Sequence, residues 1–308
     1  MNRQLKSSLI LMLTSAIWGL AFVAQSKGSA YTGACTFIGV RFLVAAAAML
    51  PAILISDRAA RGRGERADSA KNSKGLWRAG IICGVLLFSA SLAQQEGITL
   101  GTSAGKAGFI TAIYIVTVPI INLLLFRKKT SAAIWLGVVL ALAGLYLLCL
   151  NGAETLLLSD LLVLACAIIF SFQILSVDRF SPHYDAMKLA AIEFLTCGVL
   201  GSVLMIPFDI VPAGFATWAD NLLQAESCIS IAYAAVFSSA IGYTLQIVGQ
   251  RGLNPAIASL IMSMESVFAM LAGWIILNQR MTPRELAGSA LILVAVIIAQ
   301  IPPKTKSK

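Results

Sequence analysis

The chain has 308 residues, of which 58% are apolar and only 12% are charged. Soluble domains carry roughly 25% charged residues, so this composition excludes a soluble enzyme, and its long apolar runs exclude a disordered protein. The net charge of +9 would suggest nucleic-acid binding in a soluble protein, but here we assign it to membrane topology. We predict an all-α integral membrane protein with the lipid bilayer, and no nucleic acid, as a partner.

A membrane-spanning helix needs about 20 mainly apolar residues, and ten such stretches can be placed along the chain. In chain order, the predicted transmembrane helices cover residues 7–25, 33–55, 79–97, 103–126, 132–150, 159–177, 186–207, 227–248, 256–277 and 285–301. The first stretch has basic residues before it, as a signal peptide does. Its apolar run exceeds the usual ~7–15 residues, so we interpret it as an uncleaved anchor.

Basic residues are distributed unevenly between the joints that connect these helices. Eighteen Lys and Arg residues fall on the side of the N-terminus, and three fall on the other side, at Lys27, Arg280 and Arg284. Because basic residues concentrate on the cytoplasmic side of membrane proteins, we expect both termini to be cytoplasmic. A bacterial inner membrane is the predicted location.

The second half of the chain repeats the first. Gly137 and Gly288 lie 151 positions apart in similar surroundings, and Arg41 falls opposite Glu193 at a spacing of 152. Five helices per half is an odd number, so the second half must enter the membrane upside down. We therefore predict two inverted five-helix repeats, in residues 1–150 and 151–308, with a site between them near the membrane midplane.

Several short motifs resemble those of the EamA-type drug/metabolite transporters. They are Trp18-Gly19, Arg41-Phe42, Ser103-Ala104-Gly105, Pro255-Ala256 with Glu265-Ser266-Val267-Phe268, and Trp274 with Arg280-Met281-Thr282-Pro283. The resemblance spans nearly the whole chain and implies a ten-helix carrier with a central cavity, usually an exporter of amino acids or small metabolites. The chain departs from the family pattern at Ser266, where Pro is frequent, and at Lys106, where Asn is frequent.

Ionisable residues inside a membrane are costly and are functional candidates. Lys106 with Arg41 and Glu96 is expected to form a charged cluster in the outer part of the membrane, either as an interfacial salt bridge or as a gate. Lys106 is also a candidate anion-binding group, because it opens a helix whose dipole adds positive potential. Glu193 toward the inner side and Glu265 near the middle of its helix are coupling or gating candidates, or structural hydrogen-bonding groups.

Neutral polar and aromatic side chains follow one face of several helices, as expected for a cavity lining. With Lys106, the predicted substrate-binding residues are Trp18, Gln94, Gln95, Tyr114, Gln173, Tyr243 and Gln246. The competing interpretation is that these amides hold helices together. Pro119 is expected to loosen the fourth helix.

Little in the sequence predicts catalytic chemistry. The six cysteines are scattered without CxxC spacing, and His183 is the one histidine, so we predict no metal site, no cofactor and no enzyme activity. The segment Gly101–Ala107 resembles a phosphate-binding loop but is one residue short and lacks the hydroxyl residue that binds Mg²⁺.

We therefore predict a secondary-active or facilitative transporter that exports amino acids or related small metabolites by alternating access. Coupling to protons stays open, as do the direction of transport and the oligomeric state. The alternative substrate class is phosphorylated or nucleotide-linked metabolites, held by Arg41 and Lys106. An integral-membrane enzyme and a receptor or scaffold without transport are the weaker hypotheses.

Overall fold

The computed structural model describes residues 3–62, 73–102, 104–128, 130–149, 157–277 and 282–300. All regular structure within these ranges is helical. The first half contains α1 (Arg3–Gly28), α2 (Ala34–Gly62), α3 (Ser73–Thr99), α4 (Ala104–Thr111), α5 (Tyr114–Phe126) and α6 (Ala132–Cys149). The second half contains α7 (Leu158–Phe180), α8 (Ala186–Met205), η2 (Ile206–Ile210), α9 (Val211–Ala213), α10 (Phe215–Leu222), α11 (Ala225–Tyr233), η3 (Ala234–Tyr243), α12 (Thr244–Gln250), α13 (Pro255–Met262), α14 (Glu265–Leu277) and α15 (Pro283–Ala299).

Eight helical stretches in the described part of the chain are long and apolar enough to cross a membrane. They are Gln4–Gly28, Ala34–Ala59, Ser73–Thr99, Lys106–Phe126, Leu158–Phe180, Ala186–Ala213, Ala225–Gln250 and Pro255–Ala272, and Ala132–Leu148 is a shorter apolar helix. Many large apolar side chains on the outer faces of these helices are exposed, as a lipid environment requires. The chain is a multi-pass membrane protein.

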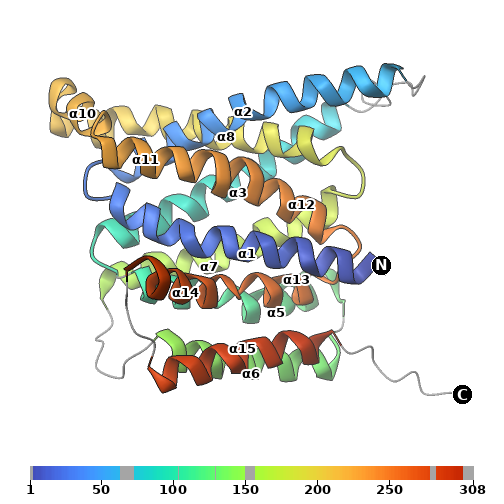
Figure 1. The fold of residues 1–308 in the computed structure, drawn as a ribbon. Helices are drawn as coiled ribbons and strands as arrows, with labels where there is room; N and C mark the ends of the chain where they lie inside the picture. Colours follow the sequence, from blue (N-terminus) through green and yellow to red (C-terminus); the bar gives the residue numbers. More distant parts are fainter. Residues whose placement is uncertain are drawn as a thin grey trace, which may run out of the picture.

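The helices lie side by side as one bundle (Figure 1). The pair formed by α2 and α8 lies at one edge and the pair formed by α6 and α15 lies at the opposite edge, with α1, α3 and α7 between them. In Figure 1, α1 begins and α15 ends on the same side of the bundle.

Two of the predicted helices are not continuous. The stretch predicted at 103–126 is interrupted at Ala112-Ile113, and the stretch predicted at 256–277 is interrupted at Ser263-Met264. At the first interruption, backbone hydrogen bonds shorten to three-residue spacing, as in Ile113 N–H to the Ile110 carbonyl. The interruption comes before Pro119, which lies inside helix α5, so Pro119 does not mark the position of this interruption.

The segment between the predicted seventh and eighth helices is also more regular than expected. The predicted helices at 186–207 and 227–248 leave residues 208–226 as a joint, but the structure forms η2, α9 and α10 there. The predicted eighth helix contains the π-helical segment η3. A π-helix leaves its carbonyls in a different register from an α-helix, and such segments are frequent at functional sites.

Glycines allow the closest helix contact at the edge of the bundle. A Cβ atom placed on Gly144 of α6 would lie 2.8 Å from the Gly288 carbonyl oxygen, and one on Gly288 would lie 2.6 Å from the Gly144 carbonyl oxygen. Small residues let the backbones of two membrane helices approach in this way. The α6–α15 pair therefore depends on these two positions having no side chain.

Candidate functional site

A cavity lies inside the bundle and is lined by helices of both halves of the chain. It has about 480 Å³ of empty space, including its open mouth, and its lining residues are Trp18, Ala21, Phe22, Gln25, Arg41, Gln94, Thr111, Tyr114, Phe170, Ile174, Ser238, Tyr243, Gln246, Met262 and Glu265. The lining combines apolar and aromatic walls with a few polar groups. This is the usual composition of a small-molecule site.

The two helix interruptions bring one acidic and one phenolic group together at the cavity. Tyr114 begins α5 and Glu265 begins α14, each directly after an interruption. The Tyr114 hydroxyl donates a hydrogen bond of 3.1 Å to Oε1 of Glu265. Glu265 is 4% exposed, so its carboxyl group is buried yet reaches the cavity. The sequence placed it in the middle of a helix, whereas the structure places it at a helix start.

Arg41 supplies a buried cation to the same cavity. Its side chain is 3% exposed, and its guanidinium carbon lies 4.6 Å from the Phe42 ring centroid and 5.5 Å from that of Phe37. Cation–π contacts of this kind contribute about 0.5–2 kcal/mol. Arg41 makes no hydrogen bond or ion pair with any other residue that the structure describes, and its Nε is buried without a partner.

Aromatic contacts connect α2, which carries Arg41, to α1. Tyr243 packs between Phe42, at 6.0 Å between ring centroids, and Trp18, at 4.7 Å. The indole N–H of Trp18 donates to the Ser238 carbonyl at 3.1 Å, a carbonyl within the π-helical segment η3. This hydrogen bond holds the Trp18 ring on the cavity wall.

A chain of amides connects the cavity to a deeper layer. Gln246 of α12 donates through Nε2 to Oε1 of Gln173 at 3.1 Å, and Gln173 of α7 donates through Nε2 to Oε1 of Glu193 at 2.9 Å. Gln246 lines the cavity, whereas Gln173 and Glu193 are fully buried outside its lining. These two predicted site residues therefore reach the cavity only through Gln246.

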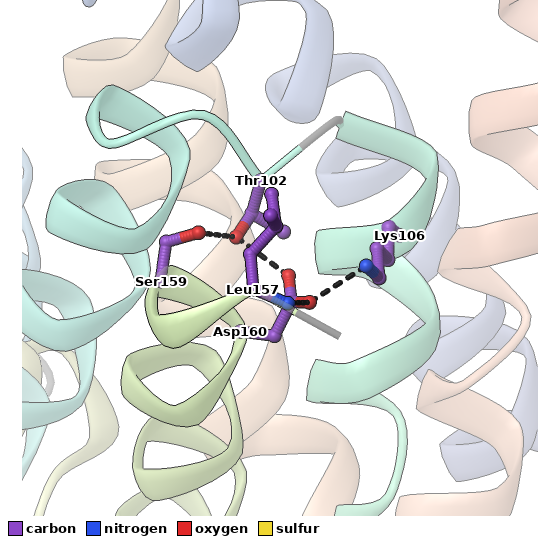
Figure 2. A network of polar contacts seen from close by, with 5 residues as sticks. All are labelled: Thr102, Lys106, Leu157, Ser159 and Asp160. Atoms are coloured by element: carbon purple, nitrogen blue, oxygen red, sulfur yellow. Dashed lines mark hydrogen bonds and ion pairs between the residues drawn. The ribbon is translucent and has the colours of Figure 1, made fainter. Parts of the chain in front are cut away.

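Lys106 lies outside the cavity lining and is held by a carboxylate (Figure 2). Its Nζ is 2.6 Å from Oδ2 of Asp160. Asp160 also accepts hydrogen bonds from the Thr102 hydroxyl at 2.9 Å and the Leu157 backbone N–H at 2.7 Å. Asp160 is thus the carboxylate paired with Lys106. The sequence had predicted a cluster of Lys106 with Arg41 and Glu96 instead. The network ties the α3–α4 connection to the start of α7.

Three consecutive polar residues at the end of α3, Gln94, Gln95 and Glu96, lie in different environments. Gln94 lines the cavity and donates to the Thr111 hydroxyl at 2.9 Å. Gln95 is buried outside the lining and donates to the Gln25 carbonyl at 3.4 Å. Glu96 is half-buried and also outside the lining. Successive residues on a helix point in different directions, so only one of the three reaches the cavity.

Sequence reasoning missed the apolar part of the lining and the ion-pair partner of Lys106. Phe22, Phe170, Ile174 and Met262 line the cavity, but apolar side chains that face lipid look the same in the sequence. Asp160 was placed at a helix boundary and not counted among the buried charges. Across the described ranges, no cluster of three or more His, Cys, Asp or Glu residues could hold a metal ion.

A bundle of membrane-spanning helices around a buried cavity with a few polar groups is an arrangement that suits a membrane transporter. The model of the EamA-like transporter family matches residues 5–150 and 157–300. The chain therefore belongs to the EamA-like transporter family.

Individual relatives agree with this assignment. The chain is 27% identical over 299 residues to an uncharacterised transporter of Archaeoglobus fulgidus, covering 97% of this chain and 87% of the relative. It is 26% identical over 291 residues to the uncharacterised inner membrane transporter YedA of Escherichia coli K12, covering 92% and 87%. It is 23% identical over 223 residues to the threonine/homoserine exporter RhtA of the same organism, covering 68% and 72%. A crystal structure with 16% identity matches the fold with a TM-score of 0.74 over 96% of both chains.

Proposed function

We propose that this protein exports amino acids or related small metabolites across the inner membrane by alternating access, as a secondary-active or facilitative transporter and not as an enzyme. The observation that carries the proposal is the buried cavity lined by both halves of the chain, with polar groups directed into an aromatic wall. The name of the relative RhtA supports amino acids as the substrate class.

The two halves are proposed to be inverted repeats, residues 1–150 and 151–308, with ten membrane crossings that include α6 and α15. The helix interruptions at Ala112-Ile113 and Ser263-Met264 support this, because they are 151 positions apart, the same spacing as the sequence repeat. Helix packing is consistent with it as well. Gly144 packs against Gly288, and Gly137 packs against Ala295. The repeat spacing converts the first contact into the second, as a two-fold axis between the halves would require.

Alternating access follows from this arrangement. Inverted repeats that are equivalent in sequence but different in conformation can exchange their conformations, and the cavity between them then opens to the other side. The basic residues favour cytoplasmic termini. Coupling to protons is a further element of the proposal, with Glu265 as the acid at the cavity and Glu193 as the acid behind it.

The alternative substrate class is phosphorylated or nucleotide-linked metabolites. It would need the cations Arg41 and Lys106 to face one ligand. Lys106 lies outside the lining and is already paired with Asp160 at 2.6 Å. A single arginine in a cavity that also contains Glu265 suits a doubly charged phosphate poorly, so amino acids are favoured.

Counterflow in proteoliposomes tests the proposal. Vesicles containing the purified protein are loaded with one compound each from a panel of amino acids, sugar phosphates, nucleosides and organic cations, and uptake of the radiolabelled compound is measured. We expect exchange of amino acids. Exchange of sugar phosphates alone would support the alternative substrate class, and no exchange with any compound would contradict transport of these classes.

A pair of tryptophan variants connects the result to the cavity. Trp18→Ala removes an aromatic wall of the cavity and should abolish most of the exchange. Trp77→Ala removes a tryptophan that is 49% exposed on α3 and should leave exchange unchanged. Equal exchange by the two variants would show that this cavity is not the transport site.

A further inference from the structure

Two opposite charges reach the cavity without neutralising each other. Arg41 of α2 and Glu265 of α14 both line it, at 3% and 4% exposure, and they form no ion pair with each other. Arg41 has no hydrogen-bond or ion-pair partner among the residues that the structure describes, and Glu265 is contacted by the neutral Tyr114 hydroxyl. An unpaired buried charge costs several kcal/mol, so a ligand carboxylate would remove that cost at Arg41, and a ligand ammonium group would stabilise the ionised form of Glu265.

We infer that the cavity binds its substrate as a zwitterion, with the substrate carboxylate on Arg41 and the substrate ammonium group on Glu265. The inference rests on the proposed transport of amino acids and deepens it, because it assigns each end of the substrate to a residue. A compound with only one of the two charges leaves the opposite charge of the cavity unpaired.

The chemistry at each end matches the assigned group. The planar guanidinium of arginine presents a fork of N–H donors that a carboxylate can accept in pairs. The rings of Phe37 and Phe42 hold the Arg41 guanidinium and leave its buried Nε without an acceptor. At the other end, a carboxylate offers only acceptors and an ammonium group offers only donors. The hydrogen bond from Tyr114 occupies Oε1 of Glu265, and Oε2 remains for the ligand.

The other charged residues near the cavity are not placed to bind the substrate carboxylate or the substrate ammonium group. Lys106 and Asp160 neutralise each other outside the lining. Glu193 lies behind Gln173 and Gln246. The cavity lining therefore holds one basic and one acidic side chain, which match the carboxylate and the ammonium group of a zwitterion.

Threonine and two analogues, each of which lacks one of its two charges, test the inference. Threonine has both charges, threonine amide lacks the carboxylate, and 2,3-dihydroxybutyrate lacks the ammonium group. Affinities of the purified wild-type protein are measured by isothermal titration calorimetry, and transport by counterflow competition. We expect wild-type protein to bind threonine at least about 30-fold more tightly than either analogue, because each analogue leaves one buried charge unpaired.

Each of the variants Arg41→Gln and Glu265→Gln should lose the preference for threonine over one of the two analogues. In Arg41→Gln the preference for threonine over threonine amide should fall to within about threefold, while the preference over 2,3-dihydroxybutyrate is retained. Glu265→Gln should do the opposite. Arg58→Gln and Glu226→Gln, which make the same chemical changes at exposed positions, should keep both preferences. Arg41→Lys keeps the charge and should keep part of the carboxylate preference, so it serves as the test if Arg41→Gln does not fold.

The outcomes separate this inference from the proposed function. Wild-type protein that transports threonine, with variants that weaken all three ligands equally, would overturn the assignment of the two ends and leave amino acid transport intact. Wild-type protein that binds the analogues as well as threonine would overturn it as well. Wild-type protein that transports no amino acid would overturn both.

Discussion

Replacing Gly19 with alanine should destabilise the protein, because α1 lies directly on α14 at this residue. A Cβ atom on Gly19 would be 2.7 Å from the Ala269 nitrogen, from the Glu265 carbonyl oxygen and from Cβ of Phe268. Ordinary contacts begin at 3.4 Å, so the two helices must separate by a large part of an ångström. Overpacking of this kind costs about 1–3 kcal/mol, and each kcal/mol should lower the melting temperature by about 1–2 °C in a chain of this size.

Gly108→Ala is the matched control. It adds the same methyl group to helix α4, where the nearest atom outside the helix, Oγ of Ser266, would be 3.7 Å away. That variant should melt at the wild-type temperature or above it, because alanine favours a helix over glycine by up to about 1 kcal/mol. Melting curves are recorded in detergent at one fixed heating rate, since unfolding of such proteins is often irreversible. If Gly19→Ala melts as high as Gly108→Ala, the contact between α1 and α14 is not as close as we describe.

Three further predictions concern the surroundings of the cavity. Lys106→Met should lower stability by about 3 kcal/mol because it leaves Asp160 as an unpaired buried charge, and the double variant Lys106→Met/Asp160→Leu should regain most of that loss; an equally unstable double variant in the melting assay would contradict the ion pair. Gln173→Leu should cost about 1–3 kcal/mol, because Glu193 and Gln246 both lose their partner, and an unchanged melting temperature would mean that this amide chain contributes nothing. A reporter enzyme fused after the last residue should be active only when it is of a type that works in the cytoplasm, and activity of a periplasmic reporter would refute the predicted topology.

The sequence was informative about which stretches form helices, because long apolar runs mark them directly. It was less so about their ends, since the stretches predicted at 33–55 and 79–97 are observed as Ala34–Gly62 and Ser73–Thr99. The stretch predicted at 159–177 is observed as Leu158–Phe180. It was much less informative about continuity. The interruption at Ala112-Ile113 contains neither Gly nor Pro, so no local breaking signal marks it in the sequence, whereas Pro119 lies inside helix α5.

The candidate site could be predicted in part for the same reason. Trp18, Arg41, Tyr114, Gln246 and Glu265 all line the cavity, because a polar group within an apolar helix must face away from lipid. That rule does not say which buried surface it faces. Lys106 instead faces Asp160 across the α4–α7 contact, and only the three-dimensional packing reveals this partner.

The proposed inverted repeats lead to a prediction about the opposite-facing state. Arg41 and Glu193, 152 residues apart, would be equivalent positions of the proposed halves, yet Arg41 lines the cavity and Glu193 lies outside its lining. If the halves exchange conformations, Arg41 withdraws from the cavity and Glu193 enters it. The substrate carboxylate then loses its cation and meets an anion, which favours release.

Accessibility of single cysteines can detect this exchange. In a variant whose six native cysteines are replaced by alanine, Arg41→Cys and Glu193→Cys are prepared separately and treated with a hydrophilic thiol reagent. In the conformation described here, position 41 should react and position 193 should be protected. Conditions that favour the opposite-facing state, such as an outward substrate gradient in proteoliposomes, should reverse the order. If both positions change reactivity in the same direction, the two halves do not exchange conformations, because exchange requires one position to leave the cavity when its equivalent enters.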